Sequence, residues 1–118
     1  MNDKDAGVRN VPRLAARMRL GAIRLDLARF TACARGRELT LTRMEFDLLA
    51  YLMQHAGRVI SQEELAGRVL RAVYSAESSL VRVHMSHLRR KLGSSSEVIE
   101  TVRGRGFRVR EQRHAAHR

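Results

Sequence analysis

The chain has 118 residues, the size of one ordinary domain, and a formal net charge of +11 from 23 basic against 12 acidic residues. Most of that excess lies in residues 78–118, and such a clustered field implies a polyanionic partner, either nucleic acid or an anionic membrane surface. No apolar run approaches the roughly 20 residues that span a bilayer, and residues 1–17 lack the apolar centre of a signal peptide. The single cysteine, Cys33, cannot form an internal disulfide. We therefore expect a cytoplasmic protein without a membrane partner.

The first part of the chain predicts a tail followed by a small sheet. Residues 1–17 are polar, hold the only proline and show no sustained period, so we interpret them as a flexible tail or linker. From Met18 to Thr42 the pattern becomes short and alternating, with a turn at Arg35–Gly36–Arg37, which predicts three or four antiparallel strands. The side chains expected on one side are Ile23, Leu25 and Leu27. Cys33, on one of these strands, is interpreted as a small buried hydrophobic residue.

Two helices then begin with the same start signal. Thr42 and Glu45 have the spacing of a capping box, in which each residue's side chain accepts a hydrogen bond from the other's backbone amide. This helix should run to about Ala56 and end at Gly57. Its predicted core stripe is Phe46, Leu49, Leu52, Met53 and Ala56. Ser61 and Glu64 repeat the capping pattern and predict a second helix from about Gln62 to Leu70.

A third helix is predicted at residues 78–92, after a loop from Arg71 to Glu77, and Gly93 should end it. At 100° per residue, its apolar side chains gather into one stripe, formed by Val81, Met85, Leu88 and Leu92. The opposite face should be exposed and consists of Ser79, Arg82, Val83, Ser86, His87 and Arg90.

The last predicted element is a hairpin at residues 98–110 that turns at Gly104–Arg105–Gly106 and carries arginines on both arms. Three apolar residues are expected to pack on the core, namely Val102, Phe107 and Val109. Residues 111–118 are expected to form a basic tail. A basic helix that can fill a major groove, beside a ribbon that can reach a neighbouring groove, predicts a reader of duplex DNA.

Three segments carry a resemblance to a known family: LTRMEFDLLAYLMQHAGRVISQEELAGRV, VRVHMSHLRRKL and IETVRGRGF. In sequence and spacing they resemble the winged helix-turn-helix effector domain of OmpR/PhoB-type response regulators of bacterial two-component systems, over residues 18–110. The resemblance implies an α+β fold with an N-terminal antiparallel sheet, three helices and a C-terminal wing. It also implies a sequence-specific regulator of transcription that binds double-stranded DNA, with the recognition helix 78–92 in the major groove and the wing 98–110 in the minor groove.

The resemblance assigns roles to individual residues. DNA contacts in the recognition helix are implied for Ser79, Arg82, Val83, Ser86, His87, Arg89 and Arg90, and in the wing for Arg103 and Arg105. Some family members contact RNA polymerase through the loop before the recognition helix, here represented by Arg71, Tyr74 and Glu77. Members also bind direct repeats as head-to-tail pairs. His87 and Ser86 stand where relatives often place arginine, so the bound sequence should depart from the usual one.

Other functions remain open at this point. A winged-helix adaptor could dock RNA polymerase or another protein while binding DNA weakly, and an RNA-binding winged helix is disfavoured by the scarcity of aromatic residues for base stacking. Residues 1–17 are too short for a receiver domain, so the chain is either a stand-alone effector or part of a longer regulator.

No enzyme activity, cofactor or metal is expected. The sequence holds no arrangement typical of a catalytic site. His84 and His87 have a metal-like spacing, but zinc needs three or four ligands and no further ligand stands nearby.

Overall fold

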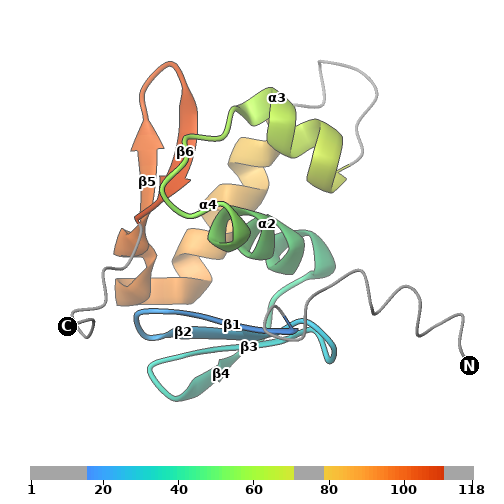
Figure 1. Cartoon of the computed structure of the whole chain (residues 1–118), viewed down its shortest axis with the longest axis vertical. Helices are drawn as coiled ribbons and strands as arrows, with labels where there is room; N and C mark the ends of the chain where they lie inside the picture. Colours follow the sequence, from blue (N-terminus) through green and yellow to red (C-terminus); the bar gives the residue numbers. More distant parts are fainter. Residues whose placement is uncertain (1–15, 71–78, 111–118) are drawn as a thin grey trace, which may run out of the picture.

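The computed structural model of the chain describes residues 16–70 and 79–110. Figure 1 shows a sheet at one end of the molecule, helices stacked above it and a hairpin standing beside them. The strands are β1 (Arg17–Leu20), β2 (Ile23–Asp26), β3 (Thr31–Ala34), β4 (Arg37–Leu39), β5 (Ile99–Val102) and β6 (Gly106–Val109). The helices are α2 (Arg43–Gln54), α3 (Gln62–Leu65), the π-helix η2 (Ala66–Leu70), α4 (Leu80–Leu92) and the 3₁₀-helix η4 (Gly93–Val98). This architecture confirms the predicted winged helix-turn-helix.

The N-terminal sheet is antiparallel with the order β1-β2-β3-β4, as the alternating pattern predicts. Its first strand begins at Arg17, one residue before the predicted start of the domain. The expected turn between β3 and β4 is present, with Arg35 and Gly36 at φ values of 55° and 79°. The prediction for Cys33 is wrong. Because side chains alternate along a strand, burial of Ala32 and Ala34 leaves Cys33 half-buried on the outer face of the sheet.

Helix α2 starts at the predicted capping box. The Glu45 amide donates to the Thr42 Oγ1 at 3.2 Å, and the Thr42 amide donates to the Glu45 Oε1 at 2.9 Å. The helix ends at Gln54, two residues earlier than expected. Its buried surface is wider than one stripe and also includes Leu48 and Ala50, because α2 contacts elements on several sides, namely α4, η2, β1 and β6.

The second predicted helix is present over its whole span, but its geometry changes halfway. The Ser61 Oγ accepts a hydrogen bond from the Glu64 amide at 2.9 Å and caps the first turn. From Ala66 to Leu70 the chain widens into a π-helix, a segment that includes Gly67. Glycine disfavours an α-helix because it has no side chain to pack and because its backbone loses more conformational entropy than that of other residues when it becomes helical.

Helix α4 buries the predicted stripe of Val81, Met85, Leu88 and Leu92. The helix stops at Leu92, and the predicted stop residue Gly93 follows as its C-cap with φ +58°. The serine run that follows is more ordered than a simple stop signal, because it forms η4 and leads directly into β5. No helix among residues 16–70 and 79–110 is long and apolar enough to cross a bilayer.

The hairpin is joined to the helical part by a short bridge. The Ile60 amide donates to the Phe107 carbonyl at 2.8 Å, and the Phe107 amide donates to the Ile60 carbonyl at 2.9 Å. Phe107 and Val109 are buried as predicted, but Val102 is not in the core. In the β5–β6 register Val102 pairs with Gly106, on the face opposite to Phe107, and Ile99 takes the buried position instead.

Candidate nucleic-acid interface

Helix α4 presents a continuous exposed face. All the residues predicted on it are exposed, namely Ser79, Arg82, Val83, Ser86, His87 and Arg90. Val83 keeps 47% of its surface accessible, and Leu80, one turn before it, keeps 45%. The sequence interpretation missed Leu80, although its i,i+3 spacing from Val83 places both on one face. An exposed apolar pair among polar groups could contact thymine methyl groups.

The three adjacent basic residues of the last turn point in three directions. Successive side chains on a helix are turned by about 100°, so Arg89, Arg90 and Lys91 cannot share one environment. Arg89 reaches the hairpin, Lys91 reaches the start of α2, and Arg90 is exposed between them.

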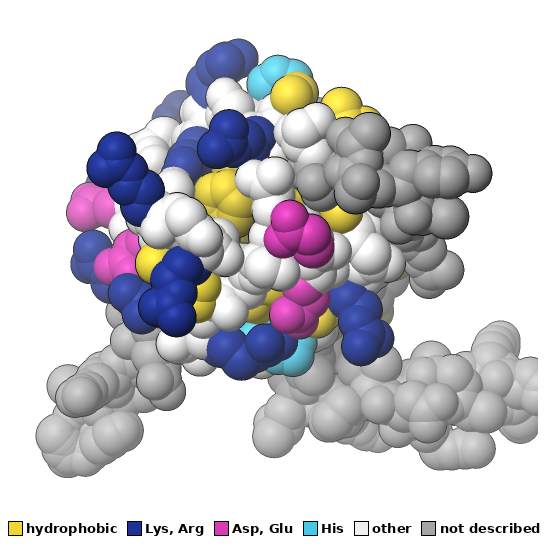
Figure 2. All heavy atoms as spheres, turned by 90° about the horizontal axis from the view of Figure 1, so that it is seen from above, with side chains coloured by type: hydrophobic (Ala, Val, Ile, Leu, Met, Phe, Trp, Pro, Cys, Tyr) yellow, Lys and Arg dark blue, Asp and Glu magenta, His cyan; other side chains and the backbone are white. Residues whose placement is uncertain are grey.

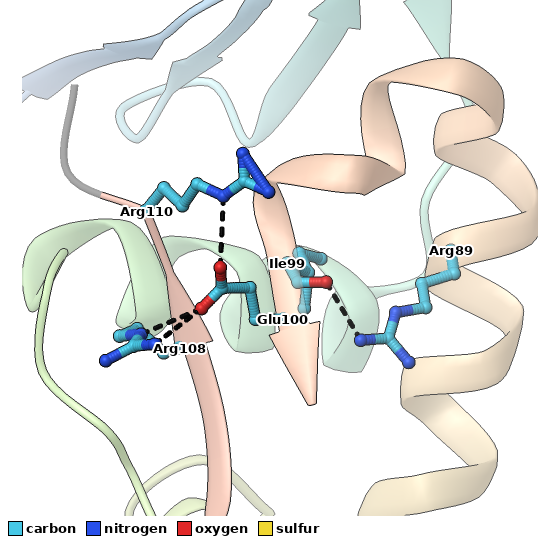
Figure 3. Close-up of polar contacts among 5 residues, drawn as sticks. All are labelled: Arg89, Ile99, Glu100, Arg108 and Arg110. Carbon is cyan, nitrogen blue, oxygen red and sulfur yellow. Dashed lines mark hydrogen bonds and ion pairs between the residues drawn. The ribbon is translucent and has the colours of Figure 1, made fainter. Parts of the chain in front are cut away.

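Arg89 connects α4 to the first strand of the hairpin, as Figure 3 shows. Its Nη2 donates to the Ile99 carbonyl at 3.0 Å and to the Thr101 Oγ1 at 2.9 Å. Its Cζ lies 5.8 Å from the centroid of the Phe107 ring. Burial lowers the pKa of Arg89, which still leaves the guanidinium charged at neutral pH.

Lys91 forms an ion pair with Glu45, the capping-box residue of α2. The Nζ–Oε1 distance is 2.8 Å, and the Glu45 side chain is only 3% exposed. Burial pushes the pKa of Glu45 upward, but the hydrogen bonds from Lys91 and from the Thr42 amide outweigh it and hold the pKa below its ordinary value. The N-terminus of α2 and the C-terminus of α4 are thereby joined.

The arginines of the hairpin fall into two groups. Arg108 and Arg110 both bind Glu100, at 2.7 Å and 3.1 Å (Figure 3), and the hydrogen bond from Arg108 is the main reason that the pKa of Glu100 lies below its ordinary value. Arg103 and Arg105 are exposed in the turn, and neither forms an ion pair within residues 16–70 and 79–110. The turn therefore leaves two cations available to an external anion.

A hollow of about 230 Å³ lies between the hairpin, α3 and α4. Arg82 and Arg105 line it together with Glu63, which is exposed and which the sequence interpretation did not single out. Figure 2 looks down on this side of the molecule and shows Lys and Arg side chains spread over much of it, with acidic side chains both near the middle and at the left edge. The surface is thus positive but holds a local negative charge beside α3.

Helix α3 is held against α2 through Glu64. Its Oε2 accepts from the Tyr51 hydroxyl at 2.6 Å and from the Arg58 Nη2 at 2.8 Å. These two hydrogen bonds, the one from Arg58 first, lower the pKa of Glu64 to about 2. Glu64 is therefore engaged inside the domain, whereas its neighbour Glu63 faces the hollow.

Two predicted features are not placed by the structure. Arg71, Tyr74 and Glu77, expected to contact polymerase, lie outside the described residues, as do residues 1–15 of the predicted N-terminal tail and the whole predicted C-terminal tail. Within the described part of the chain, no three His, Cys, Asp or Glu side chains gather as a metal site would require.

Comparison with known proteins matches this chain to regulatory proteins. Residues 36–109 match the family described as "Transcriptional regulatory protein, C terminal". Regulatory protein VanRB of Enterococcus faecalis is 35% identical over 107 residues, covering 91% of this chain and 48% of that protein. The chain spans about half the length of such curated relatives or somewhat less.

Two solved structures have the same fold. The DNA-binding domain of CpxR from E. coli matches with a TM-score of 0.72 and 35% identity, over 80% of this chain and 96% of that domain. The Klebsiella pneumoniae RstA DNA-binding domain, in complex with the RstA box, matches with a TM-score of 0.72 and 26% identity, over 80% of this chain and 96% of that one.

Proposed function

Since the chain belongs to the OmpR/PhoB-type family of transcriptional regulators, as a C-terminal DNA-binding domain, we propose that it binds a specific sequence of double-stranded DNA and regulates transcription in the bacterial cytoplasm. The observation that carries this proposal is the exposed face of α4 beside two exposed wing arginines without an ion pair in the described structure. A helix of this size fits the major groove, and cations on a narrow turn suit the minor groove.

In the proposed complex, different residues position the domain and read the sequence. Arg90 contacts a phosphate, and its contribution is independent of sequence. Val83, Ser86 and His87 face base edges, and Arg82 stands beside them. Histidine offers a single hydrogen bond per ring edge, so discrimination at its base should be weaker than that of an arginine fork on guanine.

Two further partners are part of the proposal. Two copies would bind direct repeats in head-to-tail order, and the loop that holds Arg71, Tyr74 and Glu77 would contact RNA polymerase. Both are carried by family membership.

A gel-shift series tests the main proposal against its alternatives. Duplexes selected from a random pool, a scrambled duplex and a matched RNA are compared at two salt concentrations with random competitor. We expect retention of the selected duplex when competitor abolishes binding to the scrambled one. Equal, weak binding to all DNA would favour a protein-docking adaptor, and preference for RNA would favour the RNA-binding alternative.

Replacing Arg103 with alanine should weaken DNA binding and relax the preference for A·T pairs beside the main site. The reason is that an arginine in a narrow minor groove responds to groove width, which A·T tracts reduce. Selection from random flanks with wild-type and Arg103→Ala protein measures the effect. A uniform loss of affinity with unchanged flanking preference would exclude a minor-groove role for Arg103.

Replacing Glu63 with glutamine should strengthen DNA binding. Glu63 shares the hollow with Arg82 and Arg105, so its carboxylate lies where a DNA phosphate would approach and would repel it. We expect a gain of about two- to fivefold in affinity at low salt that disappears at high salt. Glu97→Gln, an exposed acid on η4, is the control and should change affinity little; a gain of equal size would indicate a general effect of net charge.

A further inference from the structure

Arg89 lies on the flank of α4 rather than on its outer face. Its guanidinium donates to a backbone carbonyl and to a hydroxyl of β5 while the aromatic ring of Phe107 lies nearby. A single Nη2 thus bridges two acceptors of β5, the Ile99 carbonyl, which Figure 3 shows, and the Thr101 hydroxyl. Such a contact fixes where the strand lies relative to the helix.

The position of β5 in turn determines where the wing turn lies. The β5–β6 register pairs Ile99 with Val109 and Val102 with Gly106, and Arg103 and Arg105 follow directly in the turn. Along a short ribbon a small rotation at the base becomes a larger displacement at the tip. The Arg89 contact, together with the Ile60–Phe107 bridge, therefore determines the distance between the outer face of α4 and the wing cations.

We propose that Arg89 is a positioning residue that sets the separation between the major-groove and minor-groove contacts, and that Arg90 is the phosphate contact of this turn. The proposal rests on the proposed DNA binding. It differs from the expectation drawn from sequence, in which both arginines contact DNA. If Arg89 turned outward to a phosphate, the Ile99 carbonyl and the Thr101 hydroxyl would lose the hydrogen bonds that Arg89 provides.

The two roles predict different responses to salt and to DNA geometry. The salt slope is the steepness with which the logarithm of the binding constant falls as the logarithm of the salt concentration rises. A phosphate contact adds about one unit to this slope, whereas a positioning contact adds none. A positioning contact instead sets the spacing penalty. This penalty is the loss of affinity for a duplex in which the major-groove motif and the A·T flank lie one base pair closer together or farther apart. The test compares Arg89→Met with Arg90→Met, two changes that remove the same charge one residue apart.

We expect Arg90→Met to lower the salt slope by about one and to leave the spacing preference unchanged. Arg89→Met should leave the slope unchanged and reduce the spacing penalty from at least about fivefold to about twofold or less. Thr101→Val, which removes one acceptor and no charge, should lower the spacing penalty partly without changing the slope. A slope lowered by about one in Arg89→Met, with an intact spacing penalty, would overturn the proposal.

A measurement without DNA keeps this proposal separate from the proposed function. In the free protein, Arg89→Met and Arg89→Lys should shift the NMR amide signals of β5 and the wing turn and raise hydrogen exchange there. Arg90→Met should leave both unchanged. If wild-type protein fails to bind any duplex, the DNA-binding proposal fails, whereas unchanged β5 amides in Arg89→Met reject the positioning role whatever the protein binds.

Discussion

Gly106→Ala is expected to detach the hairpin from the helical part of the domain and to lower the free energy of unfolding by about 3 kcal/mol or more. Gly106 adopts φ +141°, a region that side-chain-bearing residues rarely enter. A Cβ there would overlap the Ile60 carbonyl and would lie 2.8 Å from the Ser61 Cα, so the backbone of one partner would have to move. That movement would break the two hydrogen bonds between Ile60 and Phe107.

Gly104→Ala is the matched control, two residues away in the turn that precedes β6. Gly104 also has a positive φ, +74°, but a Cβ would meet nothing within 4 Å. Its substitution should cost about 1–2 kcal/mol, from backbone strain alone. Urea denaturation of the two variants measures the difference, and hydrogen exchange at Phe107 locates it. Equal losses in the two variants would show that the close approach to Ile60 does not matter.

The sequence predicted both glycines as turn residues, but only the structure separates their roles. A turn is a local feature, and permissive glycines announce it. The close approach of Gly106 to the Ile60 carbonyl joins residues far apart in sequence, and no local pattern encodes it. The same reason explains why the prediction for Val102 was wrong. Which side of β5 faces the core depends on the register of β5 with β6 and on the bridge between Ile60 and Phe107, and both join residues distant in sequence.

Helix starts and the apolar stripe of α4 could be predicted because each depends on residues within one or two turns. The roles of Arg89 and Lys91 could not be predicted in this way. Both look like surface cations in the sequence, and their partners, Ile99 and Glu45, belong to other elements. The sequence thus predicts which residues of α4 are exposed. It does not predict which of the neighbouring cations form hydrogen bonds or ion pairs inside the domain.

The Glu45–Lys91 ion pair is expected to give a coupling free energy of about 1–3 kcal/mol in a double-mutant cycle of Glu45→Gln and Lys91→Met. Lys91→Met alone would leave the buried Glu45 carboxylate with the hydrogen bond from the Thr42 amide but without its ion pair. This loss should lower the free energy of unfolding by about 2 kcal/mol. The Lys91 side chain is 38% exposed, so solvent screening keeps the coupling below that of a fully buried pair. The pair Arg43–Asp47 on the exposed face of α2, at 3.1 Å, is the control and should couple by less than about 0.5 kcal/mol.

Acid should remove this coupling, and the direction follows from the pKa of Glu45. The folded protein holds that pKa below the ordinary value of 4.5, so the ionised carboxylate contributes its full stability above about pH 4.5 and loses it as the pH falls through the lowered pKa. The cycle repeated at pH 7 and well below pH 4 should therefore show the coupling shrinking toward zero. Glu64, whose pKa is about 2, keeps its charge down to about that pH, so the link that it forms between α2 and α3 should persist until then. A coupling independent of pH would mean that Lys91 acts on Glu45 through packing, and it would remove charge from the explanation of how α4 is held.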